Sequence, residues 1–171
     1  YEVAMDLCSK AGGSPIGAAP VEAWMARRYD FSTVENLLAE PGGLAETIEV
    51  AHFWDRIFDT YQELKKALDP FADEVLGHFS HVYAHGTSLY IILLGRAADD
   101  ARAEQILLEV WDTAMTICLK QGAVISHHHG AGLARQPYVD DALGSSHIVL
   151  RRIKEALDPA GIMNPGKLGL E

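Results

Sequence analysis

The sequence has 171 residues, of which 49% are hydrophobic and 22% are charged, a composition typical of one globular domain with a substantial core. Its formal net charge of −10 argues against a nucleic-acid partner, because binding to phosphates requires clustered Lys and Arg. No apolar run reaches the roughly 18 residues that suggest a membrane span. We therefore expect a single domain over residues 1–171.

The cysteines and the first residues bear on where the protein works. Cys8 and Cys118 lie in helical patterns without Cys-x-x-Cys spacing, which predicts buried free thiols in a reducing compartment. The start of the chain has no signal-peptide pattern and its end is not Ser-Lys-Leu, so we expect a cytoplasmic protein. The chain begins at Tyr1, already inside an amphipathic pattern, which predicts a fragment of a longer protein.

Hydrophobic periodicity and turn residues divide the chain into alternating helices and strands. In chain order, the expected elements are a helix over 1–11, a helix from Pro20, a strand over 44–53, a helix over 54–68, strands over 75–83 and 87–94, a helix over 97–120, a short strand over 123–126 and a helix over 143–157. Gly122 is expected to close the long helix in a left-handed conformation. Trp24, Trp54 and Trp111 lie on helical stripes and are expected in the core.

The order of these elements predicts the fold class. Strands joined both by a hairpin and by helical crossovers indicate an α+β fold, with an antiparallel sheet and helices packed mainly on one face. A ferredoxin-like split βαβ arrangement is the expected sub-type.

Three adjacent imidazoles, His127, His128 and His129, stand between an apolar run and a Gly-x-Gly turn. Imidazole changes its charge near neutral pH, so the cluster suits proton handling or metal ligation. The glycines let the backbone turn sharply and let another group approach. A structural turn with one functional and two solvated histidines is the alternative.

Three further places carry candidate functional residues. The hairpin over 80–90 is dense in polar rings and ends at Tyr90, whose hydroxyl needs a partner if it is buried. Arg28 is suited to binding an anionic substrate group, or it pairs with a nearby surface carboxylate. The segment over 156–167 excludes regular structure through two Pro and two Gly, with its apolar Ile162 and Met163 expected to be buried and its polar Asn164 and Lys167 free to touch a neighbouring surface.

Two of these motifs together resemble a known family. The ending Asp-Pro-x-Gly-Ile-Met-Asn-Pro-Gly-Lys, at 158–167, is similar to the C-terminal end of FAD-linked oxidases of the vanillyl-alcohol-oxidase type. Ser-His-His-His-Gly-x-Gly, at 126–132 and followed by Arg135, resembles the alkyldihydroxyacetonephosphate synthase branch of that family. Trp54-Asp55-Arg56 and the hairpin leading to Tyr90 are similar to that branch as well.

The resemblance implies residue roles and also a departure. Metal-assisted relatives that oxidise 2-hydroxy acids carry a His-x-Gly-Asp-Gly-Asn-x-His hairpin. Here the hairpin holds His81, lacks the Gly-Asp-Gly-Asn core and ends in Tyr90, so we expect no metal site. By resemblance, Tyr90 and His127–His129 are the catalytic groups. Arg28 is the substrate-binding residue, and of these residues it matches the family pattern least well.

The resemblance also implies FAD as the cofactor, bound mainly in a separate N-terminal domain. No Gly-rich phosphate loop is present in this chain, so we expect it to be the C-terminal substrate or cap domain, with Asn164 and Lys167 contacting the cofactor. The implied partners are its own FAD-binding domain, a small-molecule or lipid-like substrate and a second copy in a homodimer.

Three kinds of function are compatible with these observations. The implied reaction is acyl-to-alkyl exchange on an acyl-glycerone phosphate, as in ether lipid synthesis, with the isolated fragment inactive. A flavin oxidase or dehydrogenase of another alcohol or 2-hydroxy acid is the alternative within the class. A His-rich metal-binding module or a non-catalytic ligand-binding domain is the alternative outside it.

Overall fold

The computed structural model describes residues 1–170 and forms two compact units, one of Tyr1–Glu35 and one from Asn36 on. The first unit holds α1 (Glu2–Lys10), α2 (Ala19–Arg27) and the start of α3 (Ser32–Ala39). None of these three described helices has a buried residue, because each is short and packs few side chains. The expected burial of Trp24 and Cys8 is therefore wrong: Trp24 is 59% exposed and Cys8 is exposed.

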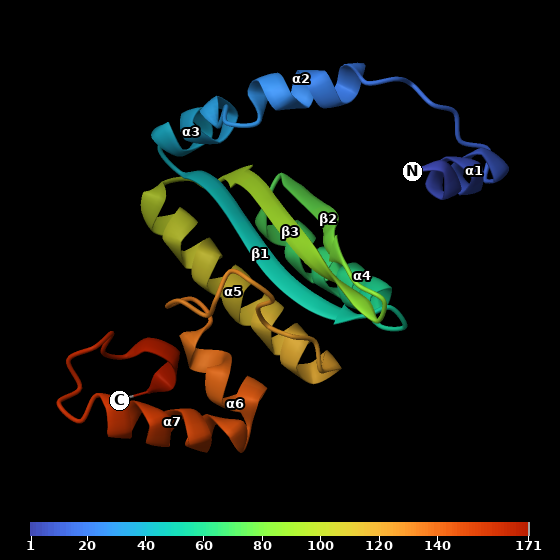
Figure 1. Ribbon diagram of the computed structural model, residues 1–171. Coiled ribbons are helices and arrows are strands. Elements are labelled where there is room, and N and C mark those ends of the chain that lie inside the picture. Colours follow the sequence, from blue (N-terminus) through green and yellow to red (C-terminus); the bar gives the residue numbers. More distant parts are fainter. Residues whose placement is uncertain (171) are drawn as a thin grey trace. The chain divides into compact units, whose positions relative to one another are not determined.

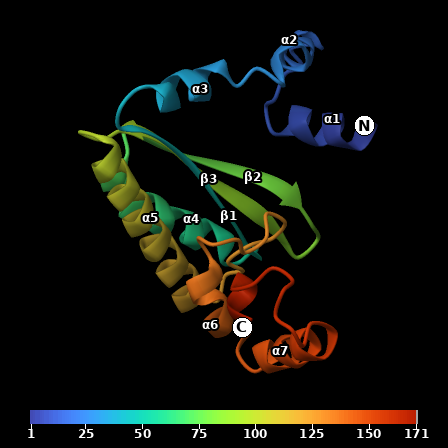
Figure 2. The same cartoon turned by 90° about the vertical axis from the view of Figure 1, so that its left-hand side faces the viewer.

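The second unit is built on a three-stranded antiparallel sheet (Figure 1). Its strands are β1 (Gly43–Phe53), β2 (Glu74–Val82) and β3 (Gly86–Arg96), in the order β1-β3-β2. Two helices, α4 (Ile57–Leu68) and α5 (Asp100–Gln121), lie on one face of this sheet, as the view in Figure 2 also shows. The α+β fold with helices on one face is confirmed.

A fourth strand is reduced to a single pair of residues. The Ala51 and Val124 backbones exchange N–H···O bonds of 3.0 and 2.8 Å, antiparallel, at the outer edge of β1. The chain thus follows a split βαβ path, β1-α4-β2 and then β3-α5-Val124, which is the ferredoxin-like order. The strand expected over 123–126 is one bridge long.

Strand alternation separates the two faces of the sheet. Leu44, Ile48 and Val50 of β1 point toward the helices and are at most 2% exposed. They pack with buried residues of β2, β3, α4 and α5: Val75, Leu89, Ile91, Leu93, Leu64, Leu68, Val110, Ala114 and Met115. Trp111 joins this core at its margin. Trp54 does not, because it lies in the turn before α4, where it is 46% exposed and its Nε1 donates to the Tyr83 carbonyl at 2.9 Å.

The C-terminal part continues with α6 (Val139–Leu143) and α7 (Ser146–Leu157). Gly144, with φ of 52°, separates them, so the helix expected over 143–157 begins three residues later. Gly122 closes α5 with φ of 72°, as predicted. Short 3₁₀ turns lie at Asp69–Phe71, Gln136–Tyr138 and Lys167–Gly169. No helix within residues 1–170 is both long enough and apolar enough to cross a bilayer.

The closing segment is ordered by polar contacts rather than by burial. Asp158 accepts the backbone N–H groups of Ile162 at 3.1 Å and Met163 at 2.9 Å, and it also pairs with Lys154. Ile162 and Met163 themselves are 77% and 63% exposed, so their expected burial is wrong. The contacts that order this segment therefore come from the Asp158 carboxylate and not from the packing of Ile162 and Met163.

Candidate functional site

The sheet face turned away from α4 and α5 carries a row of polar side chains. Glu49 of β1 stands directly opposite Tyr90 of β3, and His78 of β2 stands opposite Tyr90 on its other side. Residues paired across antiparallel strands point to the same face, so these three side chains are neighbours. Tyr90 also shares this face with Ser88 and Ile92, as strand alternation predicts.

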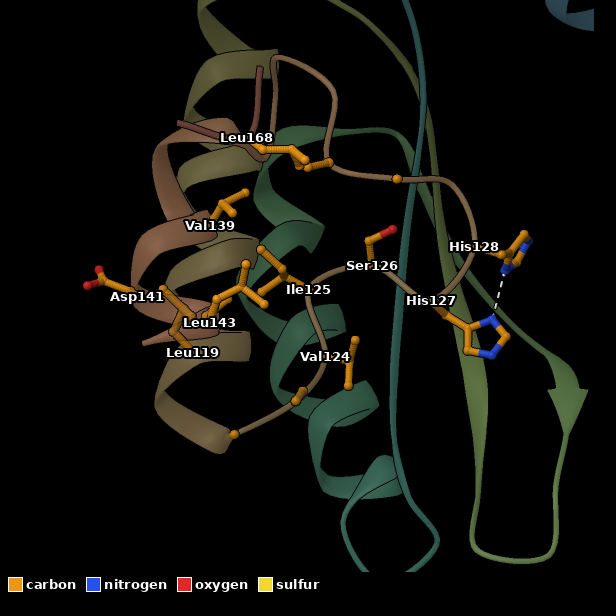
Figure 3. Close-up of a pocket in the computed structure, with 15 residues that line it drawn as sticks. Leu119, Val124, Ile125, Ser126, His127, His128, Val139, Asp141, Leu143 and Leu168 are labelled. Carbon is orange, nitrogen blue, oxygen red and sulfur yellow. Dashed lines mark hydrogen bonds between the residues drawn. The ribbon is translucent and has the colours of Figure 1, made fainter. Parts of the chain in front are cut away.

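The histidine triplet meets Tyr90 on this face. The Tyr90 hydroxyl lies 2.5 Å from His128 Nε2, and the two residues are 38 positions apart in the sequence. His128 Nδ1 lies 2.9 Å from His127 Nδ1, the contact drawn as a dashed line in Figure 3. The His129 ring stands edge-on to the Tyr90 ring, with centroids 5.3 Å apart. The structure therefore brings together all four residues that were predicted to be catalytic.

Glu49 is a site residue that the sequence reasoning missed. Its side chain is fully buried, and its two oxygens accept the backbone N–H of His127 at 2.9 and 3.1 Å. The N–H groups of His128 and His129 each lie 3.4 Å from Oε2. The only signal in the sequence was the place of Glu49 in an alternating strand, which does not reveal a partner 78 residues away.

Arg135 holds the histidine triplet against β1. Its buried guanidinium donates to three backbone carbonyls: Ile125 at 2.7 Å, Gly130 at 3.2 Å and Glu49 at 3.0 Å. The same group lies 4.7 Å from the centre of the Trp111 ring. Because Ile125 and Gly130 flank the triplet, one side chain fixes both of its ends to β1.

The local electrostatics keep both members of the Tyr90–His128 pair neutral. Desolvation lowers the pKa of His128, with the nearby His81, His129 and His127 acting in the same direction and Glu49 opposing them. Desolvation raises the pKa of Tyr90, and the Glu49 carboxylate adds to this effect. A neutral phenol can therefore donate to a neutral imidazole at neutral pH, and the pair is able to give or take a proton.

A fourth imidazole, that of His81, approaches the same place. The His81 ring centre lies 4.3 Å from that of His128, and one nitrogen each of His81, His127 and His128 lies within 4.8 Å of the others. This spacing is compatible with a shared ion. The expectation that the site works without a metal rests on the altered hairpin, in which Tyr90 replaces an expected histidine, and it stays a prediction.

The other predicted residues have surroundings of their own. Arg28 belongs to the first unit, where its guanidinium contacts Met25 Sδ at 3.3 Å and lies 4.7 Å from the Tyr29 ring centre. Asn164 and Lys167 line a pocket of about 390 Å³ with other residues of the C-terminal segment and with none of the histidines. Their substrate and cofactor roles stay predictions.

A larger cavity, of about 700 Å³, lies behind the triplet. Its lining is mainly apolar and comes from α5, α6, the segment over 123–131 and the C-terminal segment: Leu119, Ile125, Val139, Leu143 and Leu168 are its large side chains. Figure 3 shows that the imidazoles of His127 and His128 point away from these side chains. His127 and His128 are nevertheless among the residues that line the cavity, so the cavity adjoins the loop that carries the Tyr90–His128 pair.

Comparison with known proteins identifies the family of this chain. A family model described as "FAD linked oxidases, C-terminal domain" matches residues 3–168. The chain belongs to this family.

The similar proteins include synthases and FAD-linked oxidoreductases. The chain is 28% identical over 170 residues to an alkyldihydroxyacetonephosphate synthase of Dictyostelium discoideum, and 27% identical over 164 residues to one of Trypanosoma brucei brucei. These matches cover 95% and 92% of this chain but 28% and 27% of the relatives, so the chain spans little more than a quarter of their length. An uncharacterized FAD-linked oxidoreductase of Escherichia coli is 29% identical over 140 residues, which is 77% of this chain and 29% of that protein.

A solved structure supports the same fold. The crystal structure of an alkyldihydroxyacetonephosphate synthase superposes on this chain with a TM-score of 0.53 at 22% identity, covering 90% of this chain and 24% of that one.

Proposed function

We propose that this chain is the C-terminal substrate domain of an FAD-dependent enzyme in which Tyr90 and His128 move a proton at the reacting carbon of the substrate. The observation that carries the proposal is the 2.5 Å contact between the Tyr90 hydroxyl and His128 Nε2 on an uncovered sheet face. An acid–base pair needs hydrogen-bond reach and an open approach for the substrate. Both conditions hold here, since Tyr90 is only half-buried and the triplet is exposed.

The surroundings of the pair fit a flavin ring rather than a pyrophosphate. Ile92 and Leu94 on β3 and Leu76 on β2 make this sheet face apolar beside Tyr90, and Leu76 is 47% exposed. Arg96, at the far end of β3, is the one Lys or Arg among the described strand residues of this face, and its guanidinium contacts the Pro41 carbonyl and the Glu40 carboxylate. A planar aromatic ring can rest on such a surface, whereas phosphates need cationic groups or a glycine-rich turn. The flavin phosphates are therefore assigned to another domain, the proposed N-terminal partner.

When bound, the flavin ring supplies an electrophile or hydride acceptor next to the substrate carbon. The chain itself contributes the proton chemistry. Tyr90, held neutral, presents its hydroxyl to the substrate while His128 Nε2 accepts from the same hydroxyl. His127 and His129 pack around His128 and reduce its contact with water.

Within this class, we infer the acyl-to-alkyl exchange of an alkylglycerone-phosphate synthase. Two observations support a lipid-like substrate: the synthases match over more than nine-tenths of this chain, and an apolar cavity of about 700 Å³ adjoins the triplet. An oxidase or dehydrogenase of a small alcohol or 2-hydroxy acid would not need such a cavity.

The test is an assay of the complete flavin-loaded protein with two substrate types. Incubation with an acyl-glycerone phosphate and a labelled fatty alcohol should give the labelled ether product without net oxidation of either substrate. Flavin reduction by a small alcohol or 2-hydroxy acid, with no ether product, would contradict the synthase and support the oxidase. Failure of both reactions would contradict a catalytic role for the domain.

A further inference from the structure

Three groups on two neighbouring strands and one loop form a continuous line across the sheet face. Glu49 Oε1 lies 3.3 Å from His128 Nδ1, and the other ring nitrogen of His128 lies 2.5 Å from the Tyr90 hydroxyl. Glu49 and Tyr90 are direct partners in the β1–β3 register, so the imidazole spans two residues that the sheet itself holds in place. In this order, a carboxylate can orient an imidazole that takes the proton of a hydroxyl.

The carboxylate at the start of this line cannot turn away. Glu49 has no exposed surface, and successive backbone N–H groups of His127, His128 and His129 converge on it. Consecutive N–H groups of this kind form a concave site that stabilises an anion. The buried guanidinium of Arg135, bonded to the Glu49 carbonyl, is the nearby cation. The position of Glu49 is therefore set by the same loop that carries His128.

We propose that Glu49 is a positioning residue that keeps the ring hydrogen of His128 on Nδ1, so that Nε2 stays free to take the proton of Tyr90. The proposal rests on the proposed function and adds the residue that prepares the pair. In the step, the Tyr90 O–H bond breaks and an Nε2–H bond forms. The electron pair left on the phenolate oxygen then accepts the proton that leaves the substrate carbon, and the electron pair of the broken C–H bond stays on the substrate as its enolate. The imidazolium so formed has its Nδ1–H facing Glu49.

The remaining neighbours of His128 agree with this tautomer. His127 Nδ1, 2.9 Å from His128 Nδ1, is a second acceptor for the same hydrogen when His127 carries its own hydrogen on Nε2. His81 and His129 lie against the faces of the ring, with centroids 4.3 and 4.6 Å away. The groups facing Nδ1 are thus Glu49 and His127, and the group facing Nε2 is Tyr90.

The replacement Glu49→Gln tests the role of the charge with little change in shape. Oε2 of Glu49 faces three backbone N–H groups, so the amide oxygen of the variant should occupy that place. Its NH₂ group then faces His128 Nδ1, where it favours a nitrogen without hydrogen. Glu46→Gln is the matched control, because Glu46 lies on the same strand but binds the Trp111 indole on the helix side.

The experiment measures the ¹⁵N chemical shifts of His128 in ¹⁵N-histidine-labelled protein, assigned with a His128→Gln variant. We expect hydrogen on Nδ1 in the unmodified protein and in Glu46→Gln, and a shift toward hydrogen on Nε2 in Glu49→Gln. In the complete flavin-loaded protein, Glu49→Gln should lower kcat about 10- to 100-fold with KM unchanged. Glu46→Gln should leave both constants unchanged.

Hydrogen on Nε2 in the unmodified protein would overturn the proposal, even if Glu49→Gln did not fold. An unchanged tautomer together with an unchanged kcat in Glu49→Gln would overturn it as well. Because the tautomer is read without turnover, this result is separate from the activity assay. A protein that forms no product can still show whether Glu49 orients His128.

Discussion

The surroundings of Tyr90 penalise its phenolate form and so raise its pKa. Desolvation is the main cause of its raised pKa, and the neighbouring Glu49 carboxylate is the second. His128 is shifted the opposite way, toward the neutral imidazole, again mainly by desolvation. The proton of the pair therefore rests on the phenol, and the imidazole is its acceptor.

The Tyr90 shift can be observed directly. The difference between the ultraviolet titrations of the unmodified chain and Tyr90→Phe isolates one phenol among six. We expect this phenol to ionise above the ordinary tyrosine value of about 10, so that it is still protonated where an exposed tyrosine is half ionised. A midpoint at or below about 10 would contradict the assigned environment.

At the level of single residues, the sequence predicted that Tyr90 and the histidine triplet act at one site, but it did not predict which residue holds the triplet in place. Tyr90 and the histidine triplet carry family motifs, and strand alternation placed Tyr90 on a definite face. Glu49 has no such motif, and its contacts depend on a loop 78 residues later in the chain. The contact forms because the chain passes through α5 and returns to the edge of β1 at Val124. Local hydrophobic periodicity does not describe such a return.

The loop over 125–130 is the element that makes the site, and it has almost no regular structure of its own. It is held by the three carbonyl contacts of Arg135 and by the N–H contacts of Glu49. Because the Arg135 guanidinium is buried, its loss leaves polar groups without partners in a place that water does not reach.

The replacement Arg135→Lys should therefore destabilise the protein by about 2–4 kcal/mol, since a single ammonium cannot reach three carbonyls in a planar arrangement. Chemical denaturation measures this loss. Arg102→Lys is the control: Arg102 is half-exposed and pairs with Glu109 at 2.9 Å on the surface of α5, so we expect a change of about 0–1 kcal/mol. Equal effects of the two replacements would show that Arg135 does not hold the loop.

Elements with a strong local signal were predicted well, and those without one were not. The alternation of β1 and the terminal glycine of α5 have local physical causes, and both were found. Helix α3 was missed because it is only eight residues long and has no buried residue; the Asp30 side chain just before it accepts the Ser32 N–H at 3.1 Å. Leu143 and Ser146 were joined in one predicted helix because the apolar pattern continues across Gly144, whose positive φ breaks it.

At the scale of the whole molecule, the two faces of the sheet differ in what covers them. One face is closed by α4 and α5, while the other carries the Tyr90–His128 pair with partly exposed apolar side chains beside it. We propose that the flavin ring and the FAD-binding domain cover this face. The relatives, of which this chain spans little more than a quarter, are long enough to contain such a domain.

This proposal predicts that the isolated chain is colourless. The described residues provide a surface for the flavin ring but no cluster of cations for its phosphates on the same face, so most of the binding energy must come from elsewhere. Purified chain should show no stoichiometric flavin absorbance, whereas the complete protein should be yellow. Stoichiometric flavin on the isolated chain would place the whole cofactor site here and contradict the division.

The central claim is that the Tyr90 hydroxyl takes part in the chemistry, and Tyr90→Phe tests it most directly. In the complete flavin-loaded protein, this replacement should lower kcat about 10²- to 10⁴-fold while leaving flavin content and thermal stability unchanged. Tyr61→Phe, which alters a phenol packed on the helix-covered face beside Phe79, should have full activity. Unchanged turnover in Tyr90→Phe would contradict the account, and a loss of stability in place of a loss of kcat would assign Tyr90 to the core.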